Sequence, residues 1–427
     1  MRISAILLVL TIAITFAGNA TTITAPTDYN HFLNQTSSDE YSSAVKEYQF
    51  WKSKYSNATN QYPYLLKMAS AQNLMFGHNG NIAHLREATS LYEQANLMVN
   101  CSDAAILRAL AKNYISEHRF DEALAALTEA KILATGLPAT TKMLFDAHME
   151  LGNYAKAEQC MKLLAHEQSF DYLIRKAKWA DHSGKLEDAI YFMNRALDAA
   201  ESDDNEVLIQ WTTTNLADYY GHAGQIDKSY EHFLKALEID PSDAYAKKGI
   251  AWILYSHERN PTEALRIIDS INDYYYTPDY DLLRAEIAEF IGDDCLVESY
   301  MDDYYTHTAK AYGYGNMYNK YNVLLFAQHP VTQQKALSIA ESEVLLRPTA
   351  QSYSLQAMAL YQIGQVDEAK MIINEQVVNQ TFEPEPLLIA AEILQDDQSP
   401  LLKELKSELE GSLYELGPIA AMTILSL

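Results

Sequence analysis

Residues 216–241 read LADYYGHAGQIDKSYEHFLKALEIDP, and this stretch decides the fold. Small and bulky apolar side chains recur at three- and four-residue spacings on either side of Gly224, and such spacings mark one face of a helix. Gly ends a helix at low steric cost because it adopts the left-handed backbone conformation freely. The stretch therefore predicts two amphipathic helices joined by a tight turn.

A turn followed by an acidic residue and then a small or apolar residue recurs along most of the chain. The recurring residues are Ala88, Ala123, Ala157, Ala189, Ser229, Ala264, Val297, Ala336 and Ala369. Neighbouring positions are 32 to 40 residues apart, and most separations are close to 34. A period of this length is typical of helix-turn-helix solenoids. Because one helix pair cannot bury both of its apolar faces, the units must stack, and we expect an elongated array.

The repeat unit resembles the tetratricopeptide repeat family. The residues that carry the resemblance are Leu216, Ala217, Tyr220, Gly224, Ser229, Phe233, Ala236 and Pro241, together with the turn glycines Gly152, Gly184 and Gly364. The units around Ala88, Val297 and Ala336 match mainly in spacing. The resemblance implies an all-α, right-handed superhelical solenoid of stacked helix-turn-helix repeats, with about nine units over residues 41–410. It also implies binding of a protein or peptide partner through the concave face.

The two ends of the chain depart from the repeat. Residues 1–20 carry one Arg and an apolar run of 13 residues that ends in small residues. This pattern predicts a cleaved signal peptide, because a membrane anchor needs roughly 20 apolar residues. Residues 21–40 are rich in Thr, Ser, Asn and Asp, which predicts a flexible linker. The apolar residues 411–427 are predicted to cap the last helix.

Composition limits the partners and the chemistry. The 427 residues include 32 Lys plus Arg against 57 Asp plus Glu, for a formal net charge of −25. A surface of this sign disfavours nucleic acid and acidic lipid. Only Cys101, Cys160 and Cys295 are present, and so sparse a set cannot form a disulfide framework. We expect them to be buried as small apolar residues, with a single bridge between two of them as the alternative.

Motifs for catalysis, metal binding and cofactor binding are missing from the sequence. The twelve histidines show no His-Glu-x-x-His spacing, and no Gly-x-Ser-x-Gly or Gly-x-Gly-x-x-Gly pattern occurs. The sequence therefore predicts neither an enzyme nor a metal or cofactor site.

A first candidate surface is cationic. In tetratricopeptide repeats, certain positions of the first helix face the concave groove. If the units of this chain align with that repeat position by position, the groove-facing residues in three units include Arg108, Lys112, Lys142 and Lys178. Four cations on one inner surface could bind the carboxylates of a protein partner. The alternative is that they form ordinary local ion pairs.

A second candidate surface is rich in tyrosine. Residues 274–321 contain eleven of the thirty tyrosines, and runs of them occur at Tyr274, Tyr275, Tyr276, Tyr304 and Tyr305, with aspartates interleaved. Tyr offers a stiff contact area with one hydroxyl, which suits recognition of sugars, basic peptides or cationic groups. The alternative is that these residues fill space between repeat helices.

Together these patterns predict an exported scaffold, periplasmic or extracellular, that binds a protein or peptide partner. A protein that captures a small molecule or glycan on the tyrosine-rich surface is the rival hypothesis.

Overall fold

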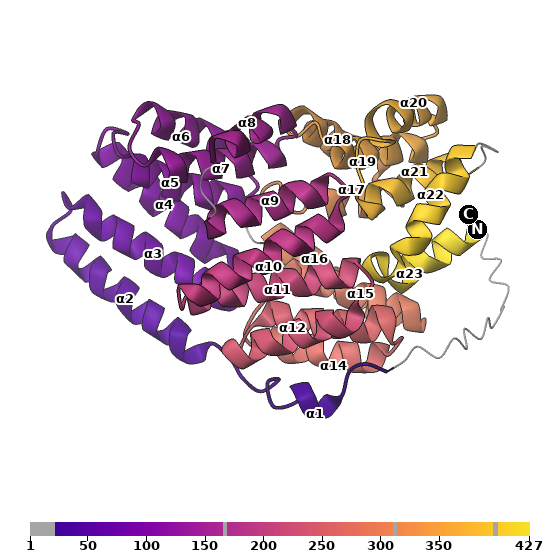
Figure 1. Cartoon of the computed structure of the whole chain (residues 1–427), viewed down its shortest axis with the longest axis horizontal. Coiled ribbons are helices and arrows are strands. Elements are labelled where there is room, and N and C mark those ends of the chain that lie inside the picture. The colour runs from indigo at the N-terminus through magenta and orange to yellow at the C-terminus, as the bar shows by residue number, and fades with distance from the viewer. Residues whose placement is uncertain (1–21, 165–168, 311–313, 396–399) are drawn as a thin grey trace.

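A computed structural model describes residues 22–164, 169–310, 314–395 and 400–427, and within these ranges the chain is helical with no β-strand. The helices follow one another as antiparallel neighbours that wind into a superhelix (Figure 1). The predicted fold class, an all-α superhelical solenoid of stacked helix-turn-helix repeats, is confirmed.

Within the described ranges, nine helix pairs form the repeat array. They are α3 (Tyr62–Asn79) with α4 (Ile82–Met98), α5 (Ala104–Ser116) with α6 (Phe120–Ile132), α7 (Leu137–Glu150) with α8 (Tyr154–Leu164), α9 (Phe170–His182) with α10 (Leu186–Ser202), α11 (Glu206–His222) with α12 (Ile226–Ile239), α13 (Ala244–Trp252) with α14 (Pro261–Asn272), α15 (Pro278–Ile291) with α16 (Asp294–Lys310), α17 (Asn319–Ala327) with α18 (Gln333–Leu346), and α19 (Ala350–Gln362) with α20 (Val366–Ile372). The π-helical turns η1 (Ile253–His257) and η2 (Ile373–Val377) extend α13 and α20. The array is preceded by α1 (Pro26–Tyr29) and α2 (Ser38–Asn57), and followed by α21 (Pro384–Leu394), α22 (Pro400–Gly411) and α23 (Leu413–Ser426).

The recurring small residue has the same place in every unit. All nine predicted positions lie in the second helix of a pair, and eight of them are fully buried. Val297 is the exception and is half-buried. The turn glycines behave as expected, since Gly152, Gly184 and Gly224 have φ of 68°, 69° and 69°. Small side chains at the buried positions let neighbouring helices approach closely.

The superhelix is wound more tightly than the expected elongated array, because units far apart in sequence contact one another. The Arg347 guanidinium, just after α18, donates from Nε to the backbone oxygen of Glu150 at 3.0 Å. A Cβ on Gly184 would meet the ring of Phe382 at 2.6 Å. Figure 1 shows α18 next to α8, and a Cβ on Gly152, in the turn before α8, would meet the Pro348 backbone oxygen at 3.0 Å. Such contacts are absent from a simple nearest-neighbour array.

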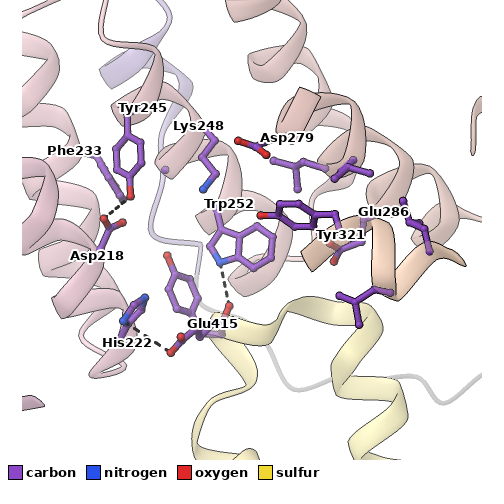
Figure 2. A pocket seen from close by; sticks show the side chains of 16 residues that line it. Asp218, His222, Phe233, Tyr245, Lys248, Trp252, Asp279, Glu286, Tyr321 and Glu415 are labelled. Atoms are coloured by element: carbon purple, nitrogen blue, oxygen red, sulfur yellow. Dashed lines mark hydrogen bonds and ion pairs between the residues drawn. The ribbon is translucent and has the colours of Figure 1, made fainter. Parts of the chain in front are cut away.

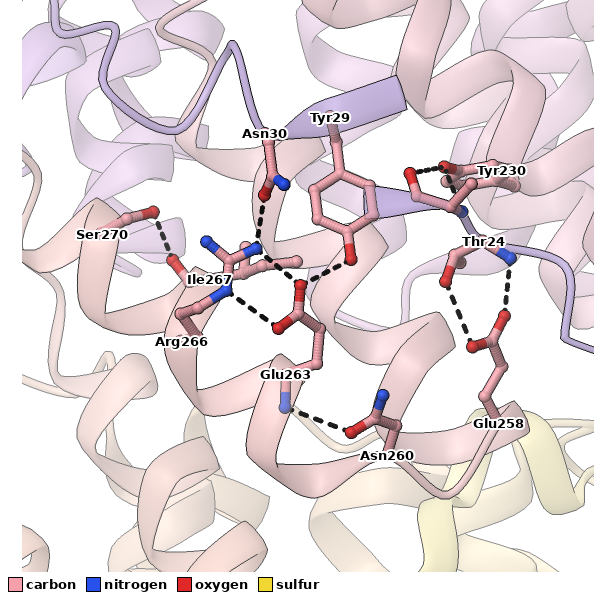
Figure 3. A network of polar contacts seen from close by, with 11 residues as sticks. Thr24, Tyr29, Asn30, Tyr230, Glu258, Asn260, Glu263, Arg266, Ile267 and Ser270 are labelled. Carbon is pink, nitrogen blue, oxygen red and sulfur yellow. Dashed lines mark hydrogen bonds and ion pairs between the residues drawn. The ribbon is translucent and has the colours of Figure 1, made fainter. Parts of the chain in front are cut away.

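The described part of residues 21–40 is packed, which corrects the predicted flexible linker. Tyr29, Phe32 and Leu33 are buried against the core of the α12–α14 region. Figure 3 shows how polar contacts fix the segment: Thr24 donates to the Glu258 carboxylate, and the Tyr29 hydroxyl donates to Glu263 Oε1 at 2.7 Å. Three buried apolar side chains outweigh the polar composition on which the prediction relied.

The C-terminal helix closes the superhelix. α23 packs against α11, η1 and α15, as well as against its chain neighbours α21 and α22. The Tyr414 backbone oxygen accepts hydrogen bonds from Trp252 Nε1 at 3.0 Å and from Ser256 Oγ at 2.6 Å. The segment predicted as a cap on the last helix therefore also joins the end of the array to its middle.

The three cysteines all lie in ranges that the structure describes, and none of them forms a disulfide. Cys160 is buried as expected, but Cys101 and Cys295 are exposed, so burial was wrongly predicted for these two.

Candidate ligand-binding cavity

A cavity of about 560 Å³ lies on the inner side of the superhelix and is partly open to solvent. Its walls come from the first helices of four consecutive units, α11, α13, α15 and α17, with α12 and the closing helix α23 completing it (Figure 2). The volume falls in the range of ordinary ligand pockets. Stacking of repeats and closure by α23 together create this space.

Four carboxylates line the cavity. Asp218 lies on α11, Asp279 and Glu286 lie on α15, and Glu415 lies on α23. Asp218 accepts a hydrogen bond from the Tyr245 hydroxyl at 2.6 Å, and Glu286 accepts one from the Tyr255 hydroxyl at 3.1 Å. Asp279 accepts a hydrogen bond from Thr277 at 3.3 Å. The charged side chains of the cavity wall are therefore predominantly acidic.

Two basic side chains also reach the cavity. His222 Nδ1 lies 3.9 Å from Glu415 Oε2 (Figure 2). Lys248 projects between Asp218 and Asp279, and its Nζ lies 5.5 Å from the centre of the Tyr245 ring. In the described part of the chain, none of the four carboxylates has a Lys or Arg nitrogen within 4.0 Å.

Burial raises the pKa of each of these carboxyl groups. Desolvation is the largest cause for all four, and it raises the pKa of Glu286 to about 7. The Tyr245 hydrogen bond and the nearby Lys248 partly oppose the rise in the pKa of Asp218. Ionising these carboxyl groups in the cavity therefore costs more free energy than ionising them in water.

Aromatic rings form much of the remaining wall. Tyr245, Trp252 and Tyr321 line the cavity together with Phe233 and Tyr414. Figure 2 shows the Trp252 and Tyr321 rings side by side at its centre. Carboxylates beside aromatic faces form a surface that favours cations.

A second cavity of about 410 Å³ adjoins the first. The two share Tyr245, Lys248, Asp279 and Tyr321. The second cavity adds further carboxylates, Asp240 and Asp243, to its lining. The acidic lining therefore continues from one cavity into the next.

The predicted cationic residues lie outside the first cavity, and three of the four have polar partners within the protein. Arg108 donates to the backbone oxygen of Thr135 at 2.8 Å, and Lys142 pairs with Asp171 at 2.8 Å. Lys178 pairs with Glu150 at 2.8 Å, and Lys112 is exposed.

The predicted tyrosines divide between packing and the second cavity. Tyr304 is fully buried, and Tyr305 stacks on Phe326 with ring centres 6.3 Å apart. Tyr274 donates to the Ser242 backbone oxygen at 2.7 Å, and Tyr276 donates to Asp281 at 2.6 Å. Of the five, only Tyr275 lines either of the two adjoining cavities.

None of the sequence-based predictions placed a site at the acidic cavity, although one pattern in the sequence pointed to it. Asp218 follows Ala217, as Lys112 follows Ala111 and Lys178 follows Ala177. The same groove-facing position therefore changes from cationic to acidic along the array. Glu286 follows Ala285 in the same way, on the first helix of its unit. Glu415 gave no such signal, because closure by α23 brings it to the cavity.

Two further properties hold for the described residues. No group of three or more His, Cys, Asp or Glu side chains there is arranged to hold a metal ion. None of the helices in those ranges combines the length and hydropathy that a membrane span requires.

Comparison with known proteins supports the interpretation of the repeats. Family models described as tetratricopeptide repeat match residues 142–204 and residues 214–243. Within these two stretches the chain matches the tetratricopeptide repeat. The matched stretches cover α8, α9, α10 and α12 and parts of α7 and α11, and they include the predicted unit positions Ala157, Ala189 and Ser229.

More distant likenesses come from solved structures of helical-repeat proteins. The human IFIT1 dimer with PPP-AAAA is 12% identical, with coverage of 74% of this chain and 71% of that chain at a TM-score of 0.47. The Cut9–Hcn1 hetero-tetramer of the APC/C is 14% identical, with coverage of 91% and 95% at a TM-score of 0.34. No curated protein sequence matches the chain.

Proposed function

We propose that the protein is a non-catalytic interaction scaffold whose tetratricopeptide repeats bind a partner polypeptide at the inner, concave face. One observation carries this proposal: first helices of four consecutive repeats, α11, α13, α15 and α17, line one partly open cavity. Helical solenoids use this concave side as an extended binding surface. Tight winding limits the accessible concave surface, so the partner would bind at the cavity and its rim.

The charge of the cavity bears on the class of partner. Asp218, Asp279, Glu286 and Glu415 would repel phosphate groups, and the formal net charge of −25 would slow the approach of any polyanion. A polypeptide is therefore a better candidate than a nucleic acid.

We also propose that the protein acts outside the cytoplasm. The support is the signal-peptide pattern of residues 1–20, which lie outside the described residues. Mass spectrometry of the native protein should find that residues 1–20 are removed. Recovery of the intact N-terminus from a soluble cytoplasmic fraction would contradict export.

Affinity isolation with the native protein tests the scaffold proposal. We expect a polypeptide to co-purify in a fixed ratio and to rebind the purified protein. Recovery of nucleic acid instead, with loss of binding after nuclease treatment, would refute the proposal.

Capture of a small molecule or glycan is the second candidate function. It is favoured by the position of Tyr275 and Asp279 on the wall of the second cavity. If mass spectrometry of the purified protein finds a bound sugar or small cation and no polypeptide, this candidate replaces the scaffold.

A further inference from the structure

We propose that the acidic cavity binds Lys or Arg side chains from a basic segment of the partner polypeptide, so that the scaffold selects basic partners. This inference rests on the proposed scaffold function and specifies the chemistry of its partner. It also assigns recognition to Asp218, Asp279, Glu286 and Glu415 instead of the predicted cationic positions.

The four carboxylates of the cavity have unused capacity to bind a cation. They come from three separate helices and converge on one space. The hydrogen-bond partners of Asp218, Asp279 and Glu286 are hydroxyl groups, and Glu415 has His222 at 3.9 Å. An ammonium or guanidinium group entering this space would form charge-assisted hydrogen bonds that the described side chains do not supply.

Two of the predicted cationic residues, Lys142 and Lys178, lack this capacity for an acidic partner. Lys142 and Lys178 already pair with Asp171 and Glu150, each at 2.8 Å. Arg347 bonds to the same Glu150, so Lys178 belongs to a contact between distant units. Binding an acidic partner there would require breaking these internal pairs.

The aromatic walls of the cavity also favour a bound cation. Trp252, Tyr245 and Tyr321 present rings to the cavity, and Tyr and Trp faces attract cations. Lys248 already illustrates this contact, with Nζ 5.5 Å from the centre of the Tyr245 ring. The cavity thus already accommodates one ammonium group, and its volume of about 560 Å³ leaves room for others.

A bound cation would also offset the free-energy cost of ionising the buried carboxyl groups. Burial raises the pKa of Asp218, Asp279 and Glu415, and raises that of Glu286 to about 7. A bound cation would relieve this cost by stabilising the ionised forms. Binding should therefore weaken as the pH falls and the carboxyl groups take up protons.

The shape of the space favours a chain over a compact ion. The adjoining cavity of about 410 Å³ shares four lining residues with the first and adds Asp240 and Asp243. Two connected acidic spaces can accept cations spaced along a polypeptide, whereas a single small cation would fill only part of one. The net charge of −25 would also speed the approach of a basic chain.

Fluorescence anisotropy with labelled, acetylated peptides of alternating Gly and Lys tests the inference on the full-length protein. Matched peptides of alternating Gly and Glu, or Gly and Ser, serve as probe controls. The double variant Asp218→Asn/Asp279→Asn keeps the side-chain shapes and the hydroxyl hydrogen bonds. We expect this variant to bind the Gly-Lys peptide at least about tenfold more weakly than the wild type.

Two further variants make the test specific. Asp188→Asn/Glu238→Gln removes the same formal charge from exposed sites on α10 and α12, and its affinity should stay within about twofold of wild type. Lys248→Met removes the resident cation and should tighten binding of the Gly-Lys peptide. Lys248→Met should raise the affinity for the Gly-Lys peptide, whereas Asp218→Asn/Asp279→Asn should lower it. A general loss of folding would lower the affinity in both variants, so opposite changes exclude it.

Several outcomes would overturn the inference. The inference fails if the wild type and the Asp218→Asn/Asp279→Asn variant bind the Gly-Lys peptide equally tightly. It also fails if the wild type binds the Gly-Glu peptide as tightly as the Gly-Lys peptide. Binding of spermidine without binding of the Gly-Lys peptide would show that the polypeptide occupant is wrong. If an isolated partner binds the double variant as tightly as the wild type, the cavity inference fails while the scaffold function stands.

Discussion

Substitution of Gly221 by Ala should destabilise the protein because it forces the closing helix α23 away from α11. A Cβ at Gly221 would lie 2.6 Å from Cε1 of the Tyr414 ring, about 1 Å inside normal carbon–carbon contact. Tyr414 has little freedom to retreat, since its backbone oxygen accepts hydrogen bonds from Trp252 and Ser256. Overpacking of this kind costs about 1 to 3 kcal/mol.

Helix propensity acts in the opposite direction. Ala is favoured over Gly in a helix interior by roughly 0.5 to 1 kcal/mol. Gly221→Ala should therefore lower the free energy of unfolding by up to about 2.5 kcal/mol net. In the Tyr414→Ala background the clash is gone, and the same substitution should stabilise the protein by up to about 1 kcal/mol.

Urea unfolding followed by circular dichroism would measure this double-mutant cycle. We expect a coupling between the two positions of about 1 to 3 kcal/mol, with the effect of Gly221→Ala changing sign between the backgrounds. If Gly221→Ala stabilises both backgrounds equally, α23 does not dock on α11 and the closed superhelix is wrong.

Three further predictions concern the array, the N-terminal segment and the cavity. Ala236→Leu should overpack a fully buried repeat position and cost about 1 to 3 kcal/mol, and an unchanged urea midpoint would show that the repeat register is wrong. Leu33→Ala should cost about 2 to 5 kcal/mol because Leu33 is buried, whereas a mobile linker would give no change in thermal stability. The pKa of Glu286 is raised to about 7 in the folded protein, so the folded state retains a proton that the unfolded state releases, and stability should fall by up to about 3 kcal/mol as the pH rises from about 4.5 to 7. Glu286→Gln should remove this part of the pH dependence, and an unaltered pH–stability profile would contradict the assignment.

The sequence was sufficient to predict the fold because each unit repeats the same local requirement. A small residue in the second helix permits close packing, and eight of the nine predicted positions are fully buried. A turn glycine with positive φ ends the first helix in several units. These features depend on residues within one or two units, so periodicity alone reveals them.

Contacts between distant units could not be predicted in the same way. The bond from Arg347 to Glu150 and the docking of Tyr414 beside Gly221 depend on how far the superhelix turns per unit. Small rotations accumulate over many repeats, and no local pattern records their sum. The packing of Tyr29 against the α12–α14 region was missed for a similar reason, since a polar composition concealed its few apolar anchors.

The same limit applies to the candidate site. Asp218 occupies a repeat position that the sequence could have identified, but Tyr321 and Glu415 reach the cavity only after winding and closure. The tyrosine-rich region was correctly recognised as unusual in composition. Most of its predicted tyrosines nevertheless pack within the protein, and Tyr304 is fully buried.

Site-specific photo-crosslinking tests the central claim, that a partner polypeptide binds in the inner cavity. Replacement of Tyr321 by p-benzoylphenylalanine places the crosslinker on the cavity wall, and the same replacement of the exposed Tyr191 on α10 is the matched control. We predict that the isolated partner polypeptide crosslinks from position 321 and not from position 191. Crosslinking from position 191 alone would contradict the claim.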